Sequence, residues 1–499
     1  MADPLLLSLD QGTTSTRAVL YDLHGREQVS ASRPLRQSYP ADGWVEHDAE
    51  EIFSSSVSAM REVLERASAP VAALGITNQR ETTVVWERAT GRPIAPAIVW
   101  QDRRTADGCA ALRDGGVEPE VSRATGLRLD PYFSGTKAAW LLDHVDGARA
   151  AAQAGALAFG TIDSWLVWKL TGGRVHATDA TNASRTLLFD LERLAWSDEL
   201  CDLLRVPRSM LPDVRDTAGD FGETLPEVLG RAIPIRGVAG DQQAAMMGQG
   251  CVRAGEMKST YGTGAFMLVH TGEHAARSQA GLLSTVAAQI GGRASYALEG
   301  SIFIAGAAIQ WLNEALGVAG GAKAVEQLAQ QARPHHGVVF VPAFTGLGAP
   351  WWDPDARGAV FGLTRDAGLA EIASAAFDAG AFQTVDLIHA MRSDAPQAFE
   401  GAHELRIDGG MASSRTFAQR LADITGLNVG RASYSETTAL GAALFAGVGS
   451  GLYADVEAAA RARPEAETFT PALAAPAREA ALARWRGAVQ CVVARTAVG

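Results

Sequence analysis

The chain opens with a short apolar segment that runs into a polar turn containing glycine. Residues 5–9 are almost entirely leucine, residues 10–16 combine one glycine with four hydroxyl side chains, and residues 17–22 become apolar again. A strand, a Gly/Thr turn and a second strand predict a β-hairpin. The tip of this hairpin is unusually rich in hydroxyl groups.

A second passage repeats this arrangement. Residues 257–264 lead through Gly-Thr-Gly into the apolar run 265–269, and Gly262 lies half a chain length beyond Gly12. The repetition predicts two similar domains, each opening on a hairpin. The alternative is that two such turns arose by chance. The predicted domains are 1–248 and 249–499.

Helical and strand patterns alternate around the hairpins. Residues 48–67 have an apolar helical face and Asp48 as the N-cap, and the apolar strand 72–76 ends at polar residues 77–81. This alternation predicts α/β domains with sites at the ends of strands. The residues after Tyr453 predict a surface helical segment. Further predicted elements are helices over 302–316, 369–391 and 416–426 and a strand over 405–407.

Composition and charge narrow the classes of function. The 499 residues carry 44 basic and 56 acidic side chains, a net charge of −12, which argues against binding nucleic acid or an anionic membrane. The longest uncharged apolar stretch, 301–312, is shorter than the about 20 residues that span a bilayer. The four cysteines form no CxxC pair, and the N-terminus has no basic leader region. These features predict a cytoplasmic protein with reduced thiols and without stable membrane insertion.

The first hairpin has the chemistry of a phosphate site. Backbone N–H groups at a glycine-containing tip and nearby hydroxyl groups suit phosphate oxygens. Asp10 ends the first strand, and a carboxylate in that place suits a hydrated Mg²⁺ ion. A polar hairpin without a ligand is the alternative.

Asp241 follows the apolar strand 238–240 in a setting of small residues. Lost solvation there tends to raise the pKa of a carboxyl group, as a base for an alcohol proton requires. An N-cap of the helix that follows is the alternative, and the two roles are compatible.

Two further strand ends carry candidate chemistry. Arg80 and Glu81 supply donors and acceptors for a polyol, although a surface ion pair is the commoner meaning of such neighbours. Gly409 and Gly410 follow a strand, where they let a ligand approach the backbone or form a plain tight turn.

Together these segments resemble the glycerol kinases of the FGGY carbohydrate kinase family. At least nine matching stretches follow one another in family order from residue 5 to about residue 450. The resemblance implies two ribonuclease-H-like, actin-like ATPase domains around a central cleft. The matching stretches are 9–15, 43–48, 75–83, 98–105, 130–134, 181–186, 239–245, 260–264, 346–350 and 436–442.

The resemblance also implies a role for each matched residue. Asp241 is the implied general base; it contacts the acceptor hydroxyl and, with Asp10, faces Mg²⁺. The implied glycerol-binding residues are Arg80, Glu81, Tyr132 and Gln242, with Phe266 against the carbon edge. Those implied to line the phosphate hairpins are Thr13, Thr14, Ser15, Arg17 and Thr263. Those implied to flank the nucleotide are Gly306, Gln310, Gly410 and Ser414, where the family usually has Asn in place of Ser414.

The function that the resemblance implies is phosphorylation of glycerol by Mg-ATP to sn-glycerol 3-phosphate, in glycerol catabolism, by a homodimer or homotetramer. A kinase of the same fold for another polyol or a ketose, such as erythritol or xylulose, is one alternative. A non-kinase actin-like ATPase is the other, and it would have no need for Arg80 and Glu81 beside a polyol-sized site.

Overall fold

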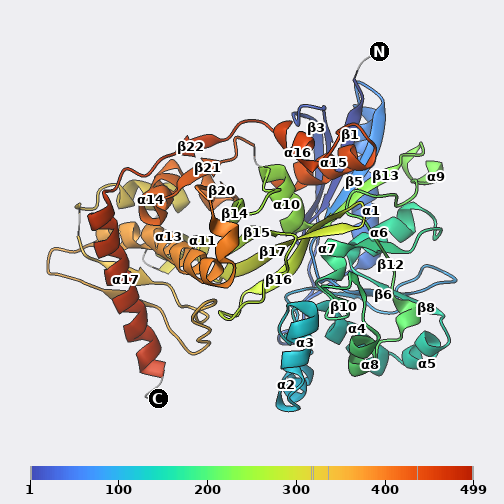
Figure 1. Cartoon of the computed structure of the whole chain (residues 1–499), viewed down its shortest axis with the longest axis horizontal. Coiled ribbons are helices and arrows are strands. Elements are labelled where there is room, and N and C mark those ends of the chain that lie inside the picture. Colours follow the sequence, from blue (N-terminus) through green and yellow to red (C-terminus); the bar gives the residue numbers. More distant parts are fainter. Residues whose placement is uncertain (1–2, 316, 319, 335, 435, 497–499) are drawn as a thin grey trace.

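Two mixed β-sheets, one in each half of the chain, organise the computed structural model (Figure 1). The structure describes residues 3–315, 317–318, 320–334, 336–434 and 436–496. The first sheet has the order β13–β5–β1–β2–β3 and the second the order β16–β17–β15–β14–β20–β21–β22. The strands of the first are β1 (Leu5–Gln11), β2 (Ser15–Tyr21), β3 (Glu27–Pro34), β5 (Val71–Asn78) and β13 (Ile235–Gly240). Those of the second are β14 (Met257–Tyr261), β15 (Ala265–Gly272), β16 (Leu283–Ile290), β17 (Arg293–Ile302), β20 (Glu404–Asp408), β21 (Asn428–Arg431) and β22 (Glu467–Phe469).

The two sheets share one topology. In the first, β1, β2 and β3 form an antiparallel meander, and β5 and then β13 add in parallel beside β1. In the second, β14, β15 and β17 form the meander, and β20 and β21 add in parallel beside β14. Strands β16 and β22 extend its two edges. This repetition confirms the predicted α/β fold of two ribonuclease-H-like domains.

Both predicted hairpins are present at the start of these meanders, as β1–β2 and β14–β15. The helices of the first half are α1 (Ala49–Glu65), α2 (Ala106–Asp114), α3 (Glu118–Thr125), α4 (Ser134–His144), α5 (Ala148–Gln153), α6 (Ile162–Leu170), α7 (Ala180–Ala183), α8 (Asp198–Leu204), α9 (Pro226–Leu229) and α10 (Asp241–Gln249). Those of the second half are α11 (Gly306–Ala315), α12 (Gly321–Ala329), α13 (Leu369–Asp394), α14 (Arg415–Thr425), α15 (Thr437–Gly449), α16 (Val456–Arg461) and α17 (Ala475–Thr496). Short strand pairs are β4 (Glu46–His47) with β7 (Ala97–Ile98), β6 (Val84–Glu87) with β8 (Leu157–Gly160), β9 (Ala177–Asp179) with β12 (Asp213–Arg215), β10 (Phe189–Asp190) with β11 (Ala195–Trp196), and β18 (Val339–Val341) with β19 (Ala359–Phe361).

Helix α1 forms as its sequence predicts. The carboxylate of Asp48 accepts hydrogen bonds from the N–H groups of Glu50 (2.8 Å) and Glu51 (3.3 Å) and so caps the first turn. Its apolar face, which includes Ile52 and Met60, is buried with Leu5, Leu7 and Leu9 of β1 in one core cluster. No helix in the described part of the chain combines the length and apolar character that a bilayer-spanning segment needs.

Two predicted segments differ from the structure. The predicted helix 302–316 begins only at Gly306, because Ile302 ends β17, and residue 316 lies outside the described residues. The segment after Tyr453 is not wholly on the surface. It adds β22 to the edge of the second sheet, and it buries Trp485 of α17 in the core cluster that includes residues of β14, β15 and α13.

Helix α15 belongs to the second half of the chain but packs on the first sheet. Its residues share a core cluster with Leu6, Val19 and Ala239 of that sheet, and it lies beside α10 where the two lobes meet (Figure 1). Glycines allow α10 and α15 to touch backbone to backbone, because a Cβ at Gly441 would lie 1.7 Å from the carbonyl oxygen of Ala244. The predicted domain division, 248/249, falls at the end of α10 and stays a prediction.

This close crossing predicts a large loss of stability in Gly441→Ala. The added methyl group must push α10 and α15 apart, and overpacking of this kind costs about 1–3 kcal/mol or more. We expect the Tm measured by differential scanning fluorimetry to fall by at least about 3 °C. The matched control is Gly487→Ala in the exposed part of α17, where a Cβ meets no atom within 4 Å. Because alanine favours a helix more than glycine does, the Tm of Gly487→Ala should equal or exceed that of the wild type. A Gly441→Ala protein with the same Tm as the wild type would contradict the packing argument.

Candidate functional site

The strand registers bring the predicted site residues of the first domain to one sheet edge. β1, β5 and β13 are parallel, with Asp10 opposite Thr77 and Asn78 opposite Gly240. Their carboxyl ends therefore lie side by side, as sites in α/β folds require. Asp10, Arg80 and Asp241 all lie at this edge because each is within two residues of the end of one of these strands.

The first hairpin closes through a hydrogen bond from the N–H of Gly12 to the carbonyl of Ser15 (2.9 Å). The hydroxyl of Thr13 accepts a hydrogen bond from the indole N–H of Trp100 (3.0 Å), and Thr14 at the tip is exposed. Arg17, predicted to line the hairpin, forms an ion pair with Glu436, just before α15. The hairpin is thereby tied to α15.

Arg80 lies at the centre of a buried ion-pair network. Its two terminal nitrogens donate to the carboxylate of Glu299 (2.6 and 3.1 Å), and its Nε lies 3.1 Å from Oδ1 of Asp241. Arg185 donates from Nε to Glu81 (2.6 Å) and from Nη2 to Glu299 (3.0 Å). Two guanidinium groups and three carboxylates are thus joined through Glu299.

Exposure separates Asp241 from the rest of this network. The side chains of Arg80, Glu81, Arg185 and Glu299 are at most 2% exposed, whereas that of Asp241 is 35% exposed. The surface ion pair considered for Arg80 and Glu81 is therefore wrong. Burial by itself raises the pKa of Glu299, but Arg185 and Arg80 outweigh it and hold the pKa at about 2.

Asp241 is the first residue of α10, and Gly240 occupies the N-cap position. The carboxylate of Asp241 accepts a hydrogen bond from the N–H of Gln242 (2.7 Å). The alternative in which Asp241 is the N-cap residue is therefore wrong, although its side chain still binds the first turn of the helix.

The backbone at Glu81 is held in an uncommon conformation. Its φ is 61°, in the left-handed region, which costs energy for a residue with a side chain. Its carbonyl accepts hydrogen bonds from the hydroxyl of Ser134 (3.0 Å) and the ammonium of Lys137 (3.3 Å). Lys137 also donates to the carbonyl of Tyr132 (2.5 Å) and so links Glu81 to Tyr132.

Tyr132 lies against the same network. Its ring makes an edge contact with Trp100, with centroids 5.6 Å apart, and the Arg185 guanidinium lies 5.6 Å from its centre. Burial raises the pKa of its phenol, and the charge of Glu81 raises it further. The phenol therefore stays protonated as a hydrogen-bond donor.

One face of the second sheet is directed at this network. Phe266 lies opposite Thr260 and Ser301, and Leu268 lies opposite Lys258 and Glu299, so these side chains share a face. The same face buries Leu268 against Met246 of α10. Phe266 is thereby placed on the side of the sheet that faces the first domain.

Lys258 is fully buried on this face and contacts Gln242. Its ammonium donates to the side-chain carbonyl of Gln242 and to the hydroxyl of Thr260 (3.0 Å). Burial lowers the pKa of Lys258, while the nearby carboxylates of Asp408 and Asp241 oppose that shift.

The tip of the second hairpin is hydrogen-bonded to the start of α11. The N–H of Gly306 donates to the carbonyl of Gly262 (3.0 Å), and the N–H of Ala307 donates to that of Thr263 (3.0 Å). A Cβ at Gly306 would lie 2.5 Å from the Gly262 oxygen, so only glycine fits there. Thr263 and Gly306, predicted at separate positions, thus belong to two segments that are hydrogen-bonded to each other.

The remaining predicted nucleotide residues lie on neighbouring elements of the second domain. A Cβ at Gly410 would meet nothing within 4 Å, while Gly409 packs on the backbone of Tyr261. Gln310 is exposed on α11 and donates to Glu314 (2.8 Å). The hydroxyl of Ser414 accepts the N–H of Phe417 (3.0 Å) as the cap of α14 and donates to Glu326 (2.7 Å).

The residues predicted to hold a metal fit a divalent cation. Burial raises the pKa of Asp10 to about 7, and the negative charge of Asp241 adds to this, while Arg17 opposes it. A cation between the two carboxylates would relieve this repulsion, and Mg²⁺ takes one or two carboxylates and keeps several waters. Among the described residues, no group of three or more His, Cys, Asp or Glu side chains is gathered for a metal.

Sequence reasoning misses Arg185 and Glu299 of this network and two polar side chains next to it, Lys258 and Gln243. The side-chain oxygen of Gln243 accepts from Nη1 of Arg80 at 3.4 Å, and Arg185 falls in the matching stretch 181–186, to which the resemblance assigns no site residue. The available signal was a charged residue within an otherwise apolar strand, as in Leu298-Glu299-Gly300. Such a residue must find a partner once buried.

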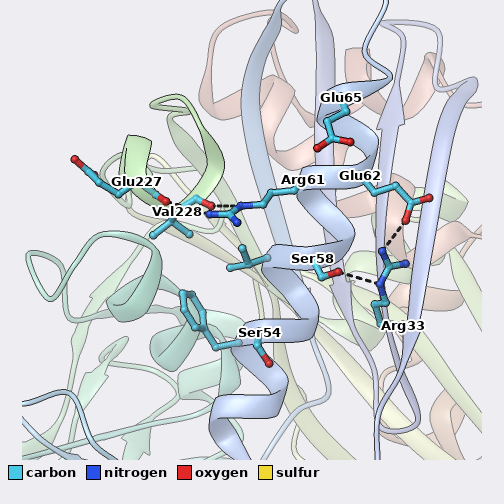
Figure 2. Close-up of a pocket in the computed structure, with 10 residues that line it drawn as sticks. Arg33, Ser54, Ser58, Arg61, Glu62, Glu65, Glu227 and Val228 are labelled. Carbon is cyan, nitrogen blue, oxygen red and sulfur yellow. Dashed lines mark hydrogen bonds and ion pairs between the residues drawn. The ribbon is translucent and has the colours of Figure 1, made fainter.

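A hollow of about 690 Å³ over α1 and α9 lies away from this site (Figure 2). Its arginines are already engaged. Arg33 donates to Ser58 (3.0 Å) and Glu62 (2.6 Å), and Arg61 donates to the carbonyl of Val228 (2.7 Å). Because these donors are satisfied within the protein, the hollow does not compete with the network as the functional site.

Known proteins with similar sequences extend over nearly the whole chain. A glycerol kinase of Methylobacterium nodulans is 55% identical over 494 residues and covers 98% of both chains. A glycerol kinase of Alcanivorax borkumensis is 55% identical and covers 97% of this chain and 98% of its own.

Solved structures agree with this. Plasmodium falciparum glycerol kinase with ADP matches with a TM-score of 0.93 at 33% identity over 98% of each chain. A xylulose kinase from Rhodospirillum rubrum, 23% identical with a TM-score of 0.87 over 99% of each chain, shares the fold. Residues 5–248 and 257–450 match the N-terminal and C-terminal domains of the FGGY family of carbohydrate kinases. The resemblance predicted from the sequence is confirmed: the chain belongs to the FGGY family of carbohydrate kinases.

Proposed function

We propose that this chain transfers a phosphoryl group from ATP to glycerol and releases sn-glycerol 3-phosphate. The observation that carries the proposal is the buried pair Arg80 and Glu81, held by ion pairs beside the partly exposed carboxylate of Asp241. This arrangement offers fixed donors and acceptors to neighbouring hydroxyl groups. The relatives at 55% identity, named glycerol kinases, support the small triol as acceptor.

In the proposed mechanism the chain mainly positions the two substrates. Phosphoryl transfer leaves little covalent chemistry to the protein. Arg80, Glu81, Tyr132 and Gln242 bind the acceptor, with Phe266 against its carbon edge. Asp241 accepts the proton of the attacking hydroxyl, and its 35% exposed carboxylate is open to an acceptor.

The nucleotide would bind at the two hairpins, β1–β2 and β14–β15. We assign its phosphates to the first hairpin, through Thr13, Thr14, Ser15 and Arg17, and to the second hairpin, through Thr263. Gly306, Gln310, Gly410 and Ser414 would flank the rest of ATP. Asp10 and Asp241 would hold Mg²⁺, which supplies charge neutralisation for the phosphates when bound.

From the family resemblance we further propose that the protein is cytoplasmic, acts in glycerol catabolism and forms a homodimer or homotetramer. Size-exclusion chromatography with light scattering tests the assembly, and a monomer at micromolar concentration would contradict it.

A panel of acceptors tests the proposed substrate against kinases of the same fold. The purified chain is supplied with Mg-ATP and with glycerol, erythritol, xylulose or no acceptor, and ADP release is followed. We expect glycerol to give the highest kcat/KM and the reaction without acceptor to be slow. A preference for erythritol or xylulose would support the first alternative. ADP release at the same rate with and without an acceptor would support a non-kinase ATPase.

Asp241→Asn should abolish most phosphorylation and preserve the fold. The amide keeps the shape of the side chain but cannot accept the proton, and general bases contribute roughly 10²–10⁴-fold. Steady-state kinetics at saturating substrates measure the loss, and the Tm and ATP binding serve as controls. Turnover above about a tenth of wild type would remove Asp241 from this role.

Arg80→Lys should impair the acceptor more than the nucleotide. Lysine keeps the positive charge but loses the planar fork that binds Glu299 with two nitrogens. We expect kcat/KM for glycerol to fall at least about tenfold, because a lost hydrogen bond to a charged group costs about 1.5–3 kcal/mol. The KM for ATP should change little.

The control for Arg80→Lys is Arg33→Ala, which removes an ion pair on the surface near α1. Exposed pairs contribute roughly 0–1 kcal/mol to stability, so glycerol kinetics should stay normal in the control. Near-normal glycerol kinetics in Arg80→Lys itself would leave the acceptor assignment without support.

A further inference from the structure

We propose that Glu299 of the second domain is a positioning residue for the acceptor site, orienting Arg80 and Arg185 of the first domain. The inference rests on the proposed function, because it assigns Glu299 a part in acceptor binding. It adds that the acceptor site is complete only when the second sheet supplies this carboxylate.

Glu299 is placed by the register of β17. It lies opposite Leu268 of β15 and Leu283 of β16, and it is 2% exposed. Side chains alternate along a strand, so Glu299 shares a face with Ala297, which is buried against Met246 of α10. The strand therefore directs the carboxylate out of its own sheet and toward the first domain.

The contacts of Glu299 fix both guanidinium groups. Oε2 accepts from Nη1 of Arg80 (2.6 Å), and Oε1 accepts from Nη2 of Arg80 (3.1 Å) and Nη2 of Arg185 (3.0 Å). The Nε of each arginine contacts a residue of the first domain: Asp241 for Arg80 at 3.1 Å and Glu81 for Arg185 at 2.6 Å. Nη1 of Arg185 is buried and has no hydrogen-bond partner in the described part of the chain. The rotation of each guanidinium, and hence the placement of Asp241 and Glu81, depends on Glu299.

Both oxygens of Glu299 are already occupied by arginine. The carboxylate therefore acts through Arg80 and Arg185 and has no need to contact the acceptor. Its negative charge also compensates the positive charges of two buried guanidinium groups that would otherwise repel each other. Removal of one partner from a buried ion pair leaves the remaining charges uncompensated. Loss of that charge should misplace the acceptor-binding side chains before it affects the nucleotide hairpins.

Three variants test this role in the full-length enzyme. Glu299→Gln removes the charge at nearly constant shape, and Glu299→Asp keeps the charge but shortens the side chain. The control Glu192→Gln removes another ion pair between the two halves of the chain, in which Arg277 contacts the exposed Glu192 at 3.0 Å, away from the network. For each protein we would measure the Tm and the KM for glycerol and for ATP.

The proposal predicts a split between the two substrates. Glu299→Gln should raise the KM for glycerol at least about tenfold and leave the KM for ATP within about twofold, as expected when a charged hydrogen bond is lost. Glu299→Asp should raise the glycerol KM by about threefold or more, and Glu192→Gln should match wild type. A normal glycerol KM in Glu299→Gln, or a parallel rise in both KM values, would overturn the proposal.

Two further outcomes are also decisive. If Glu299→Gln does not fold, the result for Glu299→Asp decides: a selective rise in the glycerol KM supports the proposal, and wild-type kinetics overturn it. If the wild-type protein prefers another acceptor, the proposed function fails, and the same split is then measured with that acceptor. Failure of the function and failure of this inference are therefore distinguishable.

Discussion

The buried network of Arg80, Glu81, Arg185 and Glu299 is the interaction on which the site depends. Four charged side chains almost without exposure are stable only because each finds a partner of opposite charge. The partners come from both sheets, so burial of these charges requires the two domains to stay together. The same requirement fixes Arg80 and Glu81, the proposed acceptor-binding residues, beside the partly exposed carboxylate of Asp241.

The repeated topology explains where the rest of the proposed site lies. Each sheet places a hairpin next to the carboxyl ends of its parallel strands, so the Gly/Thr tips come near Asp10 in one domain and near Gly410 in the other. Helices α10 and α15 join the two halves through backbone contact at Gly441. In the proposed function, the two similar loops would bind one nucleotide and the ion-pair network would bind one acceptor.

The fold could be predicted well from the sequence, because local patterns specify it. The two hairpins, the capped helix after Asp48 and the alternation of strands and helices are each visible within short segments. The start of α11 could not be predicted as reliably, since the apolar residues before Gly306 suit a strand end and a helix equally well. The tail after Tyr453 differs from its prediction because its strand, β22, forms only by pairing with β21.

The candidate site was less accessible to sequence reasoning. Arg80, Glu81 and Asp241 stand out at strand ends, but nothing near them in sequence indicates that Glu299, more than 200 residues away, pairs with Arg80. A pairing of that kind depends on how the two sheets face each other. Neighbouring opposite charges suggested a surface pair, and only the burial of Arg80 and Glu81 excludes that interpretation.

In the proposed function, this network holds acceptor hydroxyl groups beside the carboxylate of Asp241. A crystal structure of the protein with glycerol and a non-hydrolysable ATP analogue tests it most directly. We expect one terminal hydroxyl within hydrogen-bond distance of Asp241 and the others on Arg80 and Glu81, with the Arg80–Glu299 pair intact. Glycerol bound elsewhere, or bound at this place without contact to Arg80 and Glu81, would contradict it.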